Sequence, residues 1–493
     1  MKKIFALITI YVCSVAMFAA NYSGSMTVNV NGTSTVQDGV TITVTETNGV
    51  YDMVVANLTL GELRLNGIAG TADGATSAFY ADAMATIGSQ STTVKGLVRF
   101  TAKYLAADLE LTVDGQPVKL TFDNSGKAFQ LPNGDFEQWH AASGEPDHWH
   151  GFKSATGKFA STSNKIVLTQ STDIRPGATG SCAEIQSTFI IVTDANGTIT
   201  NGRLAANSMT ASNTGNHSEM DKNSTDTDNN GDKFYMEYPA KADAIKTWIY
   251  FKQGVANKEF PYATLSAVVF DGNYYQDPEN KTYTNVAAKA QNKTIEVTDW
   301  KELVVPFDYN TYAKNNAAPN AILVTVSTNA TPGKGSGKNA VDVLRLDDME
   351  LVYLAGINSV TYKGNAIAGE TIQLGEGEVP VAADFTVDKQ GVGSLAGINV
   401  VEKDGNYVAY IYVTSADLKT TQVCTVNMIV PKQTATGDVN ADGKIDIIDL
   451  NILINIMLGQ DKADKYNGRA DLNGDGVVDI VDVNNVINLI LHS

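Results

Sequence analysis

The chain has 493 residues, of which 18% are charged, and a formal net charge of −18 at pH 7. This length predicts three or four domains, and the acidic balance argues against binding to nucleic acid or to anionic membranes. Because only three cysteines occur, the sequence predicts no disulfide framework, and stability has to come from packed cores and bound metal.

The N-terminus has the three parts of a secretory signal peptide. Two lysines follow Met1, an apolar run extends from Ile4 to Phe18, and small residues stand at Ala19 and Ala20. The sequence therefore predicts a signal peptide over residues 1–20 and a secreted, extracellular or cell-surface protein. No later apolar run reaches the length of a bilayer-spanning helix, so we expect no transmembrane segment.

Residues 21–130 have the pattern of about eight short strands. Apolar and polar residues alternate in segments such as 25–31, 39–45, 100–105 and 118–122, with turn residues between them. The pattern predicts an up-and-down barrel or a sandwich. It resembles the calycin-like, lipocalin-type domain of secreted Bacteroidetes proteins, and the resemblance implies a β-barrel. Such a barrel either holds one small apolar ligand or is filled by its own side chains, and the sequence leaves both open.

The segment 131–354 carries two terminal motifs. It opens with Asn-Gly-Asp-Phe-Glu-Gln-Trp at 133–139 and closes with Leu-Asp-Asp-Met-Glu-Leu at 346–351. These motifs resemble the carbohydrate-metabolism domain, a β jelly-roll similar in shape to carbohydrate-binding modules. Segments 245–251, 300–307, 321–327 and 343–353 are predicted as strands. We expect the polar stretch between 207 and 232 to form a long surface loop, a common place for functional residues.

Pairing of the first and last strands of this jelly-roll would bring three carboxylates together. Glu137 would then lie near Asp347 and Asp348, either as a calcium site with oxygen ligands only or as a hydrogen-bonded cluster without metal. Sugar rings stack on exposed aromatic faces, and the candidate carbohydrate platforms are Trp248, Tyr274 and Tyr275.

Three histidines lie close together in the sequence, at His140, His148 and His150. They lack a helical HExxH frame, and no nearby cysteine completes a zinc set. We therefore interpret them as surface histidines.

Residues 355–433 are predicted to form one more small β domain. Segments 356–362, 379–387, 397–401, 407–414 and 424–430 have strand patterns. The region resembles an immunoglobulin-like spacer sandwich. The polar segment 431–437 is the expected linker to a last domain, residues 434–493.

Two loops near the C-terminus, beginning at Asp438 and Asp471, repeat each other 33 residues apart. Each has oxygen-bearing side chains at loop positions 1, 3, 5, 9 and 12 and a glycine at position 6. A calcium ion needs roughly six to eight oxygen ligands at this spacing, with a backbone carbonyl at position 7. The sequence therefore predicts two calcium ions, held by Asp438, Asn440, Asp442, Lys444, Asp446, Asp449, Asp471, Asn473, Asp475, Val477, Asp479 and Asp482.

The repeats resemble a type I dockerin over residues 436–493. Position 12 is aspartate rather than glutamate in both loops, and no helical pattern leads into either loop. The resemblance implies a calcium-dependent module that binds a cohesin-like domain on a scaffold or cell surface. The partner-facing positions carried over from the family are Ile447, Ile448, Ile454, Asn455, Ile480, Val481, Ile487 and Asn488. The core stripes expected from the spacing i, i+3, i+7 are Leu450, Leu453 and Met457 in one helix, and Val483, Val486 and Ile490 in the other. The alternative is a terminal cap: a C-terminal module that calcium stabilises and that binds no partner.

The predicted fold is mainly β, a chain of β-barrel, β jelly-roll and immunoglobulin-like sandwich that ends in a small α-helical dockerin. The predicted function is a secreted, non-catalytic, glycan-associated protein that docks to a cohesin-like partner and contacts polysaccharide through its jelly-roll. No local motif marks a catalytic residue, but a glycoside hydrolase can place its two carboxylates on separate strands. A dockerin-borne glycoside hydrolase or esterase in polysaccharide catabolism is therefore one alternative, and a structural cell-surface component is another.

Overall fold

The computed structural model describes residues 17–375, 377–430, 437–466 and 468–492. The mainly β prediction is confirmed, with strands throughout residues 17–429 and two long helices near the C-terminus. Most of the predicted signal peptide, residues 1–16, lies outside the described residues, and Met17–Ala20 belong to the first strand. Among the described residues, no helix has the length and apolar character needed to cross a membrane.

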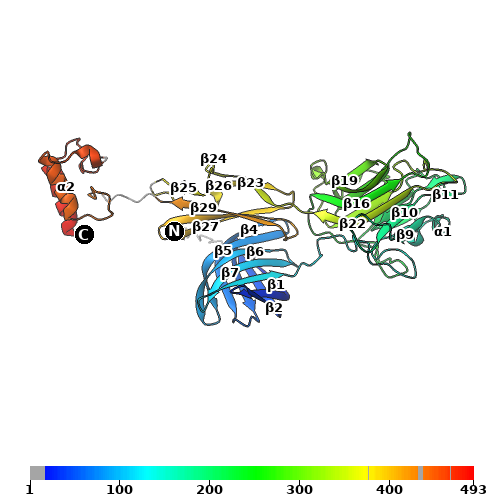
Figure 1. Cartoon of the computed structure of the whole chain (residues 1–493), viewed down its shortest axis with the longest axis horizontal. Coiled ribbons are helices and arrows are strands. Elements are labelled where there is room, and N and C mark those ends of the chain that lie inside the picture. The colour runs from blue at the N-terminus through cyan, green and yellow to red at the C-terminus, as the bar shows by residue number, and fades with distance from the viewer. Residues whose placement is uncertain (1–16, 376, 431–436, 467, 493) are drawn as a thin grey trace, which may run out of the picture. The chain divides into compact units, whose positions relative to one another are not determined.

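The N-terminal strands close into an eight-stranded antiparallel barrel in chain order, as predicted (Figure 1). Closure comes from pairing of the first and last strands, with Met26 opposite Phe122. Large side chains such as Tyr22, Phe79 and Phe100 are buried inside, and a hollow of about 630 Å³ is lined in part by Phe100 and Lys103. The strands are β1 (Met17–Val30), β2 (Thr33–Thr47), β3 (Val50–Ala56), β4 (Leu63–Asp73), β5 (Thr76–Ile87), β6 (Gln90–Phe100), β7 (Leu105–Val113) and β8 (Gln116–Asp123).

The predicted strand at 100–105 is wrong, because a turn separates β6 from β7 there. The Thr101 hydroxyl accepts the backbone N–H groups of Lys103 and Tyr104, at 3.3 and 3.1 Å. Side-chain hydroxyls that satisfy nearby N–H groups in this way favour turns over strands.

Residues 167–352 form a sandwich of two main sheets around one core. One sheet has the order β20-β16-β22-β10-β9 and the other β13-β21-β17-β19. Ile249, Leu265 and Val324, from β16, β17 and β21, are fully buried in the shared core. The strands are β9 (Val167–Ser171), β10 (Cys182–Gln186), β11 (Thr188–Ile190), β12 (Thr193–Ala195), β13 (Thr198–Thr200), β14 (Arg203–Ala206), β15 (Asn216–Met220), β16 (Ala244–Lys252), β17 (Ala263–Phe270), β18 (Tyr275–Asp277), β19 (Val286–Ile295), β20 (Thr298–Pro306), β21 (Ala321–Ser327) and β22 (Val343–Val352), with α1 (Ala160–Ser163), η1 (Phe152–Ser154) and η2 (Ala313–Asn315).

The expected first strand of this sandwich is absent from residues 131–150, which run as turns with an isolated bridge from Trp139 to Pro146. Asn133, Phe136 and His148 have φ values of 47°, 51° and 65°, in the left-handed region, and repeated left-handed residues interrupt the extended backbone of a regular strand. The segment nevertheless lies against β22, since the Gly134 carbonyl accepts the Met349 N–H at 2.7 Å.

The next region contains a three-stranded sheet, β24-β23-β26, and a four-stranded sheet, β25-β29-β28-β27. Only part of the strand predicted at 379–387 forms, because residues 382–384 make a 3-10 turn before β26. The elements are β23 (Gly356–Tyr362), β24 (Asn365–Ala366), β25 (Thr371–Gln373), η3 (Ala382–Asp384), β26 (Phe385–Gln390), β27 (Leu395–Lys403), β28 (Asn406–Thr414) and β29 (Thr421–Ile429). Most of the expected linker, residues 431–436, lies outside the described residues.

The C-terminal elements are α2 (Ile447–Met457), η4 (Ala463–Tyr466) and α3 (Ile480–His492). Leu453 from α2 and Val483 and Val486 from α3 are buried in one small core, and Leu450 and Ile490 pack against it. Met457 is wrong as a core residue, since it is 43% exposed. Ile456, three residues after Leu453, packs against the core in its place.

Candidate functional site

In the first C-terminal loop, two aspartate side chains accept backbone N–H groups. Asp438 accepts those of Asp442 and Gly443, at 3.1 and 2.8 Å. Asp449, at position 12, is fully buried and accepts those of Val439, Asn440 and Asp446, at 2.8, 3.1 and 3.0 Å. The carboxylates at the two ends of the loop are therefore held toward its interior.

The second loop repeats this arrangement. Asp471 accepts the N–H groups of Gly474, Asp475 and Gly476, and the fully buried Asp482 accepts those of Leu472, Asn473 and Asp479. Gly443 and Gly476, at position 6, both have a φ of +88°, which glycine adopts without strain.

Ligand positions of the first loop also start its helix. Asp446 is the N-cap of α2 and accepts the Ile448 N–H at 2.7 Å, while Asp449 binds back to the Asp446 N–H to complete a capping box. A capping box satisfies N–H groups that the first helical turn leaves without partners. Order in the loop and order in the helix therefore depend on the same two side chains.

Apolar side chains at the start of both helices face solvent. Ile447 is 60% exposed and Ile480 is 55% exposed, and their neighbours Ile448 and Val481 are also exposed. Of the other predicted partner positions, Ile454, Asn455 and Asn488 are exposed, whereas Ile487 is half-buried and packs against the core. Clustered exposed apolar residues mark surfaces that become covered by a partner more often than isolated ones do.

Residues 436–491 match the family model of the dockerin type I domain. The C-terminal segment is a dockerin type I domain. Domains of this type bind calcium in general, and the paired loops described above belong to the dockerin domain. No curated protein matches the chain.

Solved structures give only weak similarities. A proposed glycoside hydrolase from Bacteroides thetaiotaomicron is 14% identical, covers 54% of this chain and 87% of its own, and has a TM-score of 0.33. The CBM22-1-CBM22-2 tandem domain of Paenibacillus barcinonensis Xyn10C is 11% identical, covers 69% and 75%, and has a TM-score of 0.24. TM-scores this low carry no argument about the fold or function of this chain, and the dockerin assignment rests on the family model alone.

The predicted carboxylate trio of the sandwich lies beside an arginine. The Arg175 guanidinium forms an ion pair with Asp348 and lies 3.7 Å from an oxygen of Asp347. The Glu137 carboxylate accepts the Ser181 N–H at 3.0 Å. Burial, with the nearby charge of Asp348, raises the pKa of Asp347 to about 6. A cation is thus already paired with part of the trio, and calcium there stays a prediction.

The three aromatic candidates differ in accessibility. Trp248 is half-buried and lines a hollow of about 400 Å³ together with Lys246 and Glu350. The Arg175 guanidinium carbon lies 5.0 Å from the Trp248 ring centroid, so one face of the ring is already covered by a cation. Tyr274 is exposed and its hydroxyl donates to Glu219 at 3.0 Å. Tyr275 is wrong as a platform because it is fully buried.

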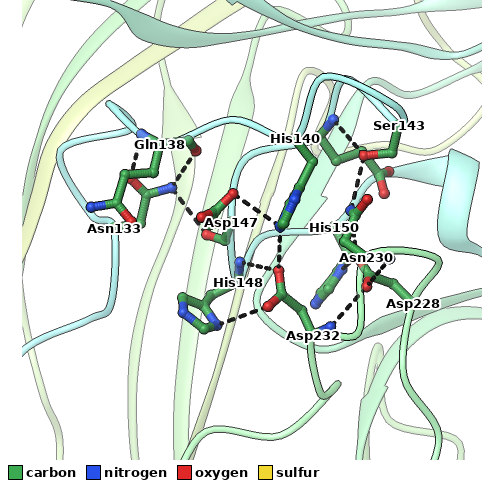
Figure 2. A network of polar contacts seen from close by, with 11 residues as sticks. Asn133, Gln138, His140, Ser143, Asp147, His148, His150, Asp228, Asn230 and Asp232 are labelled. Carbon is green, nitrogen blue, oxygen red and sulfur yellow. Dashed lines mark hydrogen bonds and ion pairs between the residues drawn. The ribbon is translucent and has the colours of Figure 1, made fainter.

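The predicted loop 207–232 is interrupted by β15 (Asn216–Met220), and the three histidines contact its last part, at Asp228 and Asp232. Figure 2 shows His140 and His148 directed toward Asp232, with His150 beside Asp228. The His140 Nε2 lies 3.0 Å from Asp147 and 3.1 Å from Asp232. Their interpretation as surface histidines is wrong for His150, which is fully buried. The sequence contained both the histidine group and the polar loop, but no spacing rule joins segments this far apart.

A largely apolar cavity of about 180 Å³ lies between η1, α1 and the short strands β11 to β15. It is lined by Phe159, Ile191, Met209 and other apolar side chains, with His217 among the polar ones. Among its described lining residues, Asp277 alone is acidic. Glycoside hydrolysis uses two carboxylates that flank the bond, and this cavity does not supply that pair.

Proposed function

We propose that the protein is secreted and attaches through its dockerin domain, in a calcium-dependent way, to a cohesin-like partner. The observation that carries the proposal is the exposed apolar pair at positions 10 and 11 of each loop, Ile447 with Ile448 and Ile480 with Val481. These residues directly follow the capping aspartates. A surface of this kind is formed only when the loop and the first helical turn are ordered.

Each loop is suited to one calcium ion. Its donors are all oxygens, from aspartate and asparagine side chains and one backbone carbonyl, as a hard cation requires. In the first loop the ion would be held by Asp438, Asn440, Asp442, Asp446, Asp449 and the Lys444 carbonyl, and in the second by Asp471, Asn473, Asp475, Asp479, Asp482 and the Val477 carbonyl. Without an ion, the anionic side chains of each loop repel one another.

The direct test is binding of the full chain to a panel of immobilised type I cohesin domains, in calcium and in EGTA. We expect saturable binding to at least one cohesin in calcium and loss of that binding in EGTA. Failure to bind any cohesin in calcium, with the dockerin domain folded, would favour the alternative of a terminal cap without a partner.

The second part of the proposal is that residues 131–354 contact polysaccharide without cleaving it. The specific observation in its favour is the half-buried Trp248 in a hollow rich in charged and polar groups. A glycan array with the full chain, followed by product analysis of each hit, tests this role. Binding that Trp248→Ala removes and Trp300→Phe retains supports it, whereas cleavage products would support the hydrolase alternative.

A further inference from the structure

A second group of ligand-type side chains is buried in the sandwich, far in sequence from the dockerin loops. Glu145, His150 and Asp228 each offer one ligand atom, and these atoms lie within 4.8 Å of one another. The side chain of His150 is 0% exposed and that of Asp228 is 2% exposed. Glu145 is buried as well. The three groups therefore face one another without direct access to bulk water.

The His150 imidazole has no hydrogen-bond partner at either ring nitrogen. Its Nδ1 lies 3.6 Å from an oxygen of Asp228, beyond hydrogen-bond range, and its ring packs against Phe234 with centroids 4.6 Å apart. A buried polar group without a partner costs about 1–3 kcal/mol. Such a group is uncommon in native proteins, and a bound ion is one of the recognised explanations for it.

The two carboxylates are held in place by backbone groups and directed at the imidazole. Glu145 accepts the Gly151 N–H at 2.7 Å. Asp228 accepts the N–H groups of Asn230 and Asp232, at 2.8 and 2.9 Å. The two carboxylates thus lie beside the buried imidazole in positions that backbone N–H groups fix.

The donor set favours one chemical class of cation. An imidazole nitrogen with two carboxylates suits zinc and similar transition metals, whereas calcium prefers oxygen ligands alone. Zinc bonds are about 2.0–2.2 Å long, and the three ligand atoms all lie within 4.8 Å of one another, so they are close enough to surround one ion.

The neighbouring group His140, Asp147 and Asp232 provides a contrast. Its side chains are partly exposed, and the His140 Nε2 already lies within hydrogen-bond distance of both carboxylates. None of its buried side-chain nitrogen or oxygen atoms lacks a hydrogen-bond partner, so this group gives no comparable indication of a bound ion.

We propose that Glu145, His150 and Asp228 bind one divalent transition-metal ion of the zinc class, which fixes the loop around Asp228 to the segment 145–151. The ion would be enclosed by protein, as in structural sites, and would not depend on the dockerin domain or on any glycan.

The test uses the untagged full chain with calcium present, so that the dockerin loops are occupied. After removal of transition metals by a chelator, Co²⁺ is titrated while the visible absorption of the bound ion is recorded, and Zn²⁺ retention is measured by elemental analysis. We expect one retained equivalent per chain. Glu145→Gln keeps an acceptor for Gly151, and Asp228→Asn keeps an acceptor for Asn230 and Asp232, so both should fold and lose this equivalent.

His140→Gln is the matched control and should retain the equivalent. Circular dichroism and thermal unfolding of each variant establish that it is folded. The proposal is overturned if the wild-type chain retains no equivalent of Co²⁺ or Zn²⁺. It is also overturned if folded Glu145→Gln and Asp228→Asn variants bind the metal as tightly as the wild type, or if only His140→Gln loses it.

Discussion

The dockerin loops and the buried trio of Glu145, His150 and Asp228 both gather charged side chains, but they differ in what supports them. Each loop draws its ligands from twelve consecutive residues, and its small core rests on a few side chains such as Leu453 and Val486. The trio is embedded in a sandwich with a large core. Loss of calcium should therefore unfold the dockerin domain, whereas loss of the transition metal from the trio should loosen only the loop of the sandwich that carries Asp228.

The largest effect is expected from calcium removal. Addition of EGTA to the full chain should unfold residues 437–492, because empty acidic loops repel themselves and the small core cannot hold the helices alone. Hydrogen–deuterium exchange should then show complete loss of protection in α2 and α3. The barrel strands and β16 to β22 should keep their protection, and equal protection of α2 with and without calcium would refute the prediction.

The aspartates at position 12 should have the next largest effect. Asp449→Asn and Asp482→Asn keep the shape of a side chain that accepts three N–H groups but remove its charge. We expect each to weaken calcium binding in its own loop by about tenfold or more, since the ion loses one anionic oxygen ligand and calcium affinity depends on the number of charged ligands. Asp464→Asn, in η4 outside both loops, is the control. Calorimetric titration of each full-length variant measures its calcium affinity. Equal affinities in Asp449→Asn, Asp482→Asn and the Asp464→Asn control would contradict the prediction.

The apolar surface tests docking apart from calcium binding. The double variant Ile447→Ser with Ile480→Ser should weaken cohesin binding by roughly 30-fold, the equivalent of one interface hot spot of about 2 kcal/mol. Its calcium affinity should not change, because both side chains point into solvent. Val304→Ser, an exposed valine of β20, should leave both affinities unaltered. A parallel fall in calcium affinity would mean that the isoleucines support the fold rather than the partner.

The smallest effect concerns the carboxylate cluster beside Arg175. Asp347 has a raised pKa of about 6 in the folded chain, against an ordinary value of 3.8, so its ionised form is disfavoured by folding. Stability is therefore lost as pH rises from about 4 to 6. Without calcium, Asp347→Asn should raise the free energy of unfolding by about 1 kcal/mol at pH 7.5 and by little at pH 4, since its lost contact with Arg175 offsets part of the gain.

Thermal unfolding at the two pH values measures this difference. A difference that does not depend on pH would contradict the assignment. If added calcium instead stabilises the wild type and not Asp347→Asn, the predicted ion at Glu137, Asp347 and Asp348 is supported.

Local patterns predicted much of this molecule, because their causes are local. Alternation of apolar and polar residues located β16, β20, β21 and most barrel strands, and the oxygen spacing located both dockerin loops. Met457 could not be excluded from the core in this way, because packing of α2 against α3 and the loops, rather than the helical period alone, decides which side chain is covered.

Long-range contacts account for what the sequence did not predict. His150 was interpreted from its neighbours His140 and His148, but its burial depends on β13 and on the loop that carries Asp228, neither of which adjoins it in the chain. Likewise, the left-handed residues Asn133 and Phe136 interrupt a segment in which the composition alone allowed a strand.

Calorimetric titration of calcium into the chelator-treated full chain tests the central claim most directly. We predict two equivalents per chain in the wild type, one in Asp449→Asn, and none at the same calcium concentrations in the double variant Asp449→Asn with Asp482→Asn. The absence of saturable binding in the wild type, or two unchanged equivalents in the double variant, would contradict the assignment of these loops as the calcium sites of the dockerin domain.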